Sequence, residues 1–278
     1  MPALNHFTSE IGLRLAAAAL LIPLTLLAAW AGGIAFLCLV GIGAALVTIE
    51  WTRLTAVHAP TRSAIWPLCA AIGGLIVFAL AGAAVALLAL PGLVVIAAAI
   101  GSAAGLRPVW CAAGIIYAGL PALALVITRS DSEFGLIAIC WLLAVVWVGD
   151  SAAFAFGRLI GGVRLAPRIS PAKTWSGATA AILGAVLVGL FTAQFVADTS
   201  VAGLVIASIG VGIAAVLGDL AESWIKRRFG AKNAGALIPG HGGMMDRVDS
   251  LIFAACAATA LGASRAGLEQ AGRGMLVW

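Results

Sequence analysis

The sequence predicts an all-α protein, a polytopic transmembrane helix bundle of about nine spans with its N-terminus in the cytosol. Three observations predict this fold. The 278 residues are 63% hydrophobic and only 10% charged, whereas soluble domains carry roughly 25% charged residues. The apolar residues also gather in runs near the length of about 20 residues that a spanning helix needs. Finally, the basic residues between the runs are distributed unequally. Because a segment in lipid must satisfy its backbone internally, we expect helices and no sheet.

Nine apolar runs are candidates for these helices, at roughly 12–31, 33–50, 65–82, 83–101, 110–127, 134–156, 174–196, 200–221 and 249–268. The third and fourth runs are separated only by a Gly-Ala turn near Gly82. They could instead form a re-entrant pair, which would leave eight spans. The first run lacks a clear cleavage site, so we interpret it as a retained helix. The chain is expected to be a single membrane domain over residues 1–278.

The loops between nine spans fall alternately on two sides of the membrane. Thirteen of the 16 lysines and arginines fall on the side of the N-terminus, and the others are Arg129, Arg265 and Arg273. Because basic loops stay in the cytosol, this asymmetry predicts a cytosolic N-terminus and an odd number of spans. The excess charge of +5 is small and scattered. It therefore excludes a nucleic-acid footprint and suits loops that face an anionic leaflet. The five cysteines form no CxxC pair, so neither a zinc site nor a disulfide framework is expected.

The residues from Gly218 to Ser250 hold charges in a chain that otherwise avoids them. At helical spacing, one face would carry Asp219, Glu222, Ser223, Lys226 and Arg227. A turn rich in glycine and proline follows, and its glycines would let backbone amides approach an anion. Asp246 and Asp249 then open the ninth span. Lys226, Arg227 and Arg228 alone are typical of a loop beside anionic lipid. The carboxylates would repel that surface unless a cation lay between, and hard oxygen ligands suit Mg²⁺.

The order of residues in this stretch resembles the hallmark of the phosphatidate cytidylyltransferase (CDP-diacylglycerol synthase) family. The matching positions are Ser223, Lys226, Arg227, Lys232, Pro239, His241, Gly242, Gly243, Asp246, Arg247 and Asp249. One position departs from the pattern, because Asn233 stands where the family usually has an acid.

A second polar stretch supports the resemblance. Asp150, expected at the end of the sixth span, precedes Gly157 and Arg158, and a loop leads to the sequence from Ile169 to Gly177. This stretch is similar to the family's S-P-x-K-T-W-E-G element, with Ser176 in place of the glutamate. The side chains of Ser170, Lys173 and Thr174 offer hydrogen bonds or charge to phosphate oxygens. The same residues could also start a helix, with Ser170 as N-cap and Pro171 in the first turn. The resemblance covers residues 140–260, the expected catalytic region, whereas residues 1–139 match mainly by hydropathy.

The resemblance implies a transferase that makes CDP-diacylglycerol and pyrophosphate from CTP and phosphatidic acid. Asp219 and Asp246 are then first-choice Mg²⁺ ligands, Asp249 and Asp150 are further candidates, and a second cation, divalent or K⁺, could assist. Asp219, Asp246, Lys173 and Lys226 would be catalytic. Substrate contacts would come from Ser170, Thr174, Ser223, Arg227, Lys232, His241, Gly242, Gly243 and Arg247. His241 need not be a general base, since a phosphate monoester is already ionised near neutral pH.

The expected location is the bacterial inner (cytoplasmic) membrane, with the active site on the cytosolic side and a homodimer permitted by the many small residues. Two other classes remain open. A polytopic transporter would place charges near the membrane midplane, and a non-catalytic lipid-binding relative would explain Asn233 and Ser176. In the front half, Glu50, Trp51 and Arg53 end the second span. They resemble the family faintly, and the alternative interpretation is that they anchor the helix at the membrane interface.

Overall fold

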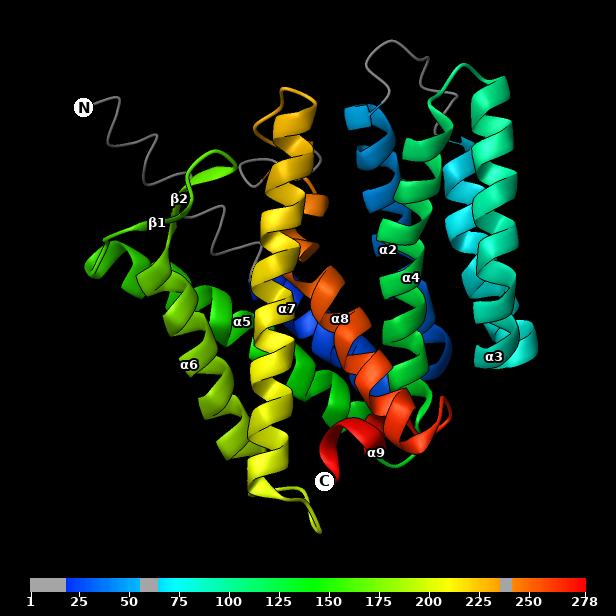
Figure 1. Ribbon diagram of the computed structural model, residues 1–278. Helices are drawn as coiled ribbons and strands as arrows, with labels where there is room; N and C mark the ends of the chain where they lie inside the picture. The colour runs from blue at the N-terminus through cyan, green and yellow to red at the C-terminus, as the bar shows by residue number, and fades with distance from the viewer. Residues whose placement is uncertain (1–18, 56–64, 236–241) are drawn as a thin grey trace.

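The protein is described by a computed structural model over residues 19–55, 65–235 and 242–278. A short helix, Ala19–Ala31, precedes the labelled elements. These are α2 (Gly33–Thr55), α3 (Ile65–Ala103), α4 (Pro108–Ser130), α5 (Gly135–Leu159), β1 (Arg164–Ala166), β2 (Ser170–Thr174), α6 (Trp175–Thr192), α7 (Val201–Arg228), α8 (Met245–Ala266) and α9 (Ala271–Leu276). Within the described ranges, seven helices are long and apolar enough to cross a membrane. The predicted polytopic helix bundle is thus confirmed (Figure 1).

Helix α3 folds back on itself at Gly82, where the backbone has φ 85° and ψ −179°. A positive φ of this size is accessible mainly to glycine. A Cβ placed on Gly73 would lie 3.6 Å from Leu93 Cδ2. In a straight helix these residues would be about 30 Å apart, so the two arms of α3 run antiparallel and in contact. The turn predicted near Gly82 is therefore present.

Helix α8 lies at the centre of the bundle and contacts helices from both halves of the chain. Its neighbours are α2, α4, α5, α7 and α9. The largest buried cluster joins α5, α6, α7 and α8, and within it the fully buried Trp141 donates a hydrogen bond to Ser208 Oγ at 3.0 Å. A second buried cluster joins α2, α4, α7 and α8 through Trp51, Tyr117, Ile225 and Met245. The position of α8 is thus set from several sides.

The expectation of no sheet was wrong. β1 and β2 form an antiparallel hairpin between α5 and α6, visible beside the bundle in Figure 1. The hairpin forms in a polar connection between two apolar helices, where strand pairing satisfies the backbone and hydropathy gives no signal. The predicted N-cap at Ser170 was also wrong. Ser170 begins β2, and Thr174 caps α6 by accepting a hydrogen bond from Gly177 N at 3.1 Å.

Helix bounds differ from the predicted runs mainly where polar residues continue a helix. α5 extends to Leu159, so Asp150 lies inside the helix and not at its end. α8 begins at Met245, which places both Asp246 and Asp249 inside it. Counting apolar residues did not include these helical turns, because α5 and α8 continue into polar sequence.

The small residues at one helix contact generate a stability prediction. A Cβ on Gly262 of α8 would collide with the carbonyl oxygen of Ala271 and lie 2.8 Å from Met275 Cγ in α9. We expect Gly262→Ala to lower the free energy of unfolding by about 1–3 kcal/mol, the usual effect of overpacking. Thermal unfolding in detergent measures this change. The matched control is Gly210→Ala on α7, where a Cβ meets nothing within 4 Å. Equal unfolding temperatures for the two variants would contradict the packing described.

Candidate active site

A close approach of α7 and α8 builds the site. A Cβ on Gly218 would lie 2.6 Å from the carbonyl oxygen of Asp249 and 3.1 Å from Phe253 Cβ. The absence of a side chain therefore allows the two backbones to touch. Asp219 and Glu222 follow Gly218 on α7, and this contact brings them next to the first turns of α8.

Three carboxylates meet at this contact. Oxygens of Asp219, Glu222 and Asp249 all lie within 4.8 Å of one another. We call these three residues the acidic cluster. Glu222 is fully buried, and no described residue offers a hydrogen bond to its Oε1 atom. Three hard oxygen donors at this separation fit a divalent cation such as Mg²⁺.

Two lysines balance part of the negative charge. Lys173, projecting from β2, pairs with Asp219 at 2.5 Å. Lys226 forms ion pairs with Glu222 and, at 2.6 Å, with Asp246. Asp150 on α5 adds a fifth carboxylate, and it accepts a hydrogen bond from Ser250 Oγ at 3.0 Å, beside Asp249. Among these groups, five acids face two lysines, so a bound cation would lower the remaining repulsion.

Asp246 shares Lys226 with Glu222 but is also held by backbone amides. Besides Lys226, it accepts hydrogen bonds from Gly243 N at 2.9 Å and from Ala234 N at 3.2 Å. A Cβ on Gly242, where φ is 82°, would lie only 3.0 Å from Asp246 Oδ2. The Asp246 carboxylate therefore holds the Gly242–Gly243 turn and orients Lys226. Asp246 is not a member of the acidic cluster.

The remaining predicted site residues differ in their contacts and in their exposure. Arg227 Nε and Nη1 donate to Ile169 O and Ala231 O, each at 3.3 Å, which ties the hairpin to the end of α7. Thr174 caps α6, and Ser170 begins β2, three residues before Lys173. Ser223 is half-buried on α7, whereas Lys232 and Arg247 are exposed. His241 and Pro239 lie outside the described residues.

Two acids with central positions were not selected from the sequence. Glu222 was placed on the correct helical face but given no role. The spacing of Glu222 from Asp219 and Lys226, which puts the three residues on one helical face, was the signal that could have indicated a role in the site. Glu50 was interpreted as an interface anchor, and this was wrong. It is fully buried and accepts hydrogen bonds from the amides of Met244 and Met245 at 2.9 and 2.8 Å. Trp51 is also buried, so neither side chain is exposed to lipid as an anchor would be.

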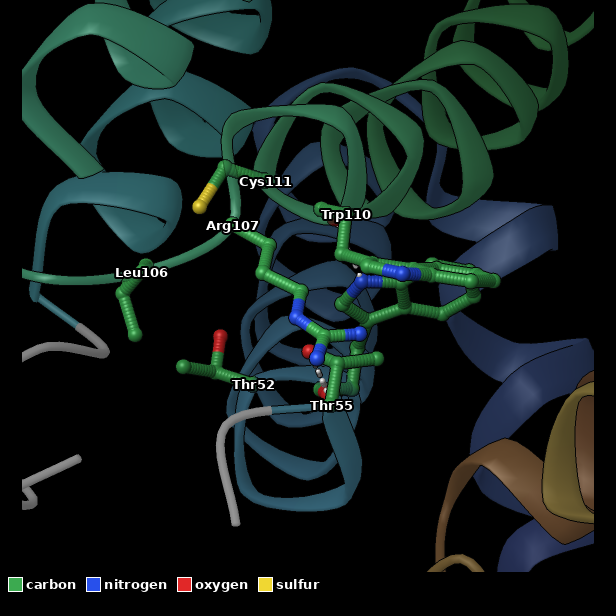
Figure 2. A pocket seen from close by; sticks show the side chains of 7 residues that line it. Thr52, Thr55, Leu106, Arg107, Trp110 and Cys111 are labelled. Carbon is green, nitrogen blue, oxygen red and sulfur yellow. Dashed lines mark hydrogen bonds between the residues drawn. The ribbon is translucent and has the colours of Figure 1, made fainter. Parts of the chain in front are cut away.

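A small cleft lies between α2 and α4, near the buried Trp51. Its lining residues are Trp51, Thr52, Thr55, Leu106, Arg107, Trp110 and Cys111, and Figure 2 shows the Arg107 side chain reaching across it toward Thr55. None of these residues is acidic. The cleft is thus chemically distinct from the acidic cluster and offers no ligand set for a divalent cation.

Comparison with known proteins agrees with this chemistry. A sequence model described as the cytidylyltransferase family matches residues 12–264. The chain belongs to the cytidylyltransferase family. It is 40% identical to a phosphatidate cytidylyltransferase of Brucella suis over 260 residues, which is 89% of this chain and 91% of the relative. The enzyme of the same name from Haemophilus influenzae is 40% identical over 129 residues, 45% of each chain. That of Staphylococcus epidermidis is 39% identical over 145 residues, 52% of this chain and 55% of the relative.

The match identifies the chain as an enzyme, a nucleotidyltransferase. It also begins in the first apolar run, so the N-terminal helices belong to the same family region as the acidic cluster.

The acidic cluster generates a metal-binding prediction. We expect the purified protein to bind Mn²⁺, a paramagnetic substitute for Mg²⁺, and Glu222→Gln and Asp249→Asn to weaken binding at least tenfold, since each removes a charged oxygen ligand. Electron paramagnetic resonance of free Mn²⁺ measures the affinity without substrates. Glu269→Gln, an exposed acid outside the site, is the matched control. If all four proteins bound Mn²⁺ equally, the acidic cluster would not be the metal site.

Proposed function

We propose that this chain is a phosphatidate cytidylyltransferase, which makes CDP-diacylglycerol and pyrophosphate from CTP and phosphatidic acid in phospholipid biosynthesis. The observation that carries the proposal is the acid and lysine network between β2, α7 and α8, found in a member of the cytidylyltransferase family. This network concentrates charge in a chain of membrane helices. Such a centre suits one lipid substrate and one soluble, highly charged substrate.

In the proposed reaction, a phosphate oxygen of phosphatidic acid attacks the α-phosphorus of CTP. A new oxygen–phosphorus bond forms while the bond to pyrophosphate breaks, and pyrophosphate leaves with the electron pair. The lipid phosphate needs no general base, because its second pKa is about 6. The protein therefore acts by positioning the two phosphates and neutralising their charge. Lys173 and Lys226 supply positive charge, and their carboxylate partners hold the two ammonium groups in place.

The proposed cofactor is Mg²⁺, with Asp219, Glu222 and Asp249 as ligands. Bound there, Mg²⁺ would supply charge neutralisation for the nucleotide phosphates. Asp150 remains a candidate for a second cation, divalent or K⁺. For Asp246 we propose the orientation of Lys226 and of the Gly242–Gly243 turn, supported by its three contacts.

The proposed substrate contacts are those expected from the sequence: Ser170, Thr174, Ser223, Arg227, Lys232, His241, Gly242, Gly243 and Arg247. Of the turn's amides, that of Gly243 already donates to Asp246. A phosphate that binds at this turn would thus need a hydrogen-bond donor other than the Gly243 amide, or that amide would have to leave Asp246.

We also propose nine spans and a cytosolic N-terminus in a bacterial cytoplasmic membrane. Counting the arms of α3 separately and adding the first apolar run gives nine. Arg129, Arg265 and Arg273 lie in the last turns of α4, α8 and α9. Figure 1 shows these helix ends on the opposite side of the bundle from the C-terminal end of α7, the helix that carries Asp219 and Glu222. From the positive-inside rule we propose that the acidic cluster faces the cytosol, where CTP is. A homodimer is proposed only because small residues permit close helix packing.

The rival functions have weaker support. Ser176 bonds to Thr174 Oγ1 and Gly161 O, and Asn233 is exposed, so neither departure from the family pattern lies in the acidic cluster. This argues against a non-catalytic relative. The five acids of the site come from α5, α7 and α8 but gather in one place. A transporter would instead place charges along a path near the membrane midplane, so this grouping argues against a transporter.

Pyrophosphate release tests the proposal. Detergent-purified protein is given phosphatidic acid, Mg²⁺ and each nucleoside triphosphate in turn. We expect release with CTP that requires both lipid and metal. Asp246→Asn should lower kcat about 100-fold or more, because Lys226 and the glycine turn lose a charged partner.

The control is again Glu269→Gln, which should keep the wild-type rate. Folding of each variant is checked by its unfolding temperature. Folded wild-type protein that releases no pyrophosphate with any nucleotide would contradict the proposed function and favour the non-catalytic relative.

A further inference from the structure

Glu50 caps a helix that it does not belong to. It lies on α2, is fully buried, and is separated by 194 positions from Met244, the N-cap residue of α8. Its Oε1 atom accepts the Met244 amide at 2.9 Å and its Oε2 atom accepts the Met245 amide at 2.8 Å. Met244 provides no side-chain cap of its own. Since the first amides of a helix have no partner within it, Glu50 replaces the missing cap, and its charge is favourable at the positive end of the helix.

Two glycines allow Glu50 to reach this position. A Cβ on Gly235 would lie 2.7 Å from Glu50 Oε1, and a Cβ on Gly243 would collide with Oε2. Because neither residue has a side chain, the backbone at Gly235 and at Gly243 lies close against the Glu50 carboxylate. A side chain at either glycine would push Glu50 away from the amides of α8.

The neighbouring Trp51 holds Glu50 on a rigid support. Its indole N–H donates to the carbonyl oxygen of Trp110 on α4 at 2.8 Å, and its ring lies 4.8 Å from that of Tyr117. A Cβ on Gly114 would lie 2.5 Å from Trp51 Cδ1, so the ring lies directly on the backbone of α4. The end of α2 is thus attached to α4, and its carboxylate to α8.

The residues fixed by this cap are those of the site. Asp246 lies one residue after Met245, and Asp249 follows three residues later. Asp249 must meet Asp219 and Glu222 of α7 to form the acidic cluster. A small displacement of the first turn of α8 would therefore change both the ligand separation and the contact of Asp246 with Lys226.

We propose that Glu50 is a positioning residue for the reaction, which sets the first turn of α8 so that Asp249 completes the acidic cluster. The inference rests on the proposed function. Glu50 itself is not one of the cluster's ligands and acts through Asp246 and Asp249. Through Glu50, the N-terminal half of the chain thereby contributes to catalysis.

The decisive variant is Glu50→Gln, which keeps the shape but turns one oxygen into a donor that faces an amide N–H. We expect the Mn²⁺ dissociation constant to rise about tenfold, as is usual when a group that orients metal ligands is changed. We also expect kcat to fall about 10- to 100-fold with a smaller change in the KM for CTP. Glu50→Asp, which keeps the charge but is shorter, should show the same direction.

The matched control is Thr48→Val on the same helix. Thr48 is fully buried, and among the described residues the partner of its hydroxyl is Ala44 O within α2, at 2.7 Å. This variant should keep wild-type Mn²⁺ affinity and kcat even if its unfolding temperature falls. A merely structural role for Glu50 would lower the unfolding temperature without changing the Mn²⁺ affinity of the folded fraction.

Wild-type Mn²⁺ affinity and kcat in folded Glu50→Gln would overturn the proposal. If that variant does not fold, Glu50→Asp decides by the same two measurements. Mn²⁺ binding needs no turnover, so a wild-type protein that binds Mn²⁺ but releases no pyrophosphate would refute the proposed function while the positioning role is still tested.

Discussion

The site depends on one interaction, the pairing of Lys226 with both Glu222 and Asp246 across the contact of α7 and α8. A carboxylate buried between apolar helices is costly when it has no partner. Lys226 shares its charge between two of them, and Lys173 neutralises a third, Asp219. In the part of the chain that the structure describes, the five acids of the site outnumber the two lysines that pair with some of them, so the centre suits a metal ion. A cation bound there would in turn attract phosphates. The remainder of the bundle brings these few side chains to one place.

The fold achieves this with small residues and with contacts between distant helices. Gly218 lets α7 touch α8, and Gly243 lets Glu50 reach the first amides of α8. α8 contacts helices from both halves of the chain, so the carboxylates on its first turns are positioned by the whole bundle. Water does not drive helices together inside lipid, which makes such close packing a main source of association. A substitution far from the phosphates can therefore alter the site through the position of α8.

Much of this was predictable from the sequence, because the bilayer imposes simple rules. Hydropathy predicted the helices and the turn at Gly82, and helical spacing placed Asp219 and Lys226 on one face. Other features depend on contacts that spacing cannot show. Glu50 meets Met244 from 194 positions away, and the hairpin before α6 forms by pairing in a polar loop. Asp246 was predicted as a ligand from resemblance. Its bonds to Gly243 and Ala234 depend on the folded turn, which no periodicity describes.

Asp219, Glu222 and Asp249 together are proposed to hold the metal ion. Anomalous diffraction from crystals of the protein grown with Mn²⁺ tests this assignment most directly, because the signal locates the ion without assumptions about activity. We expect a peak within coordination distance of all three carboxylates, at about 2.0–2.5 Å for oxygen ligands of such cations. A peak coordinated by Asp246 and Asp150 without Glu222 would contradict this assignment. A crystal in which the three carboxylates are well ordered, Lys226 still pairs with Glu222 and no peak appears would contradict it as well.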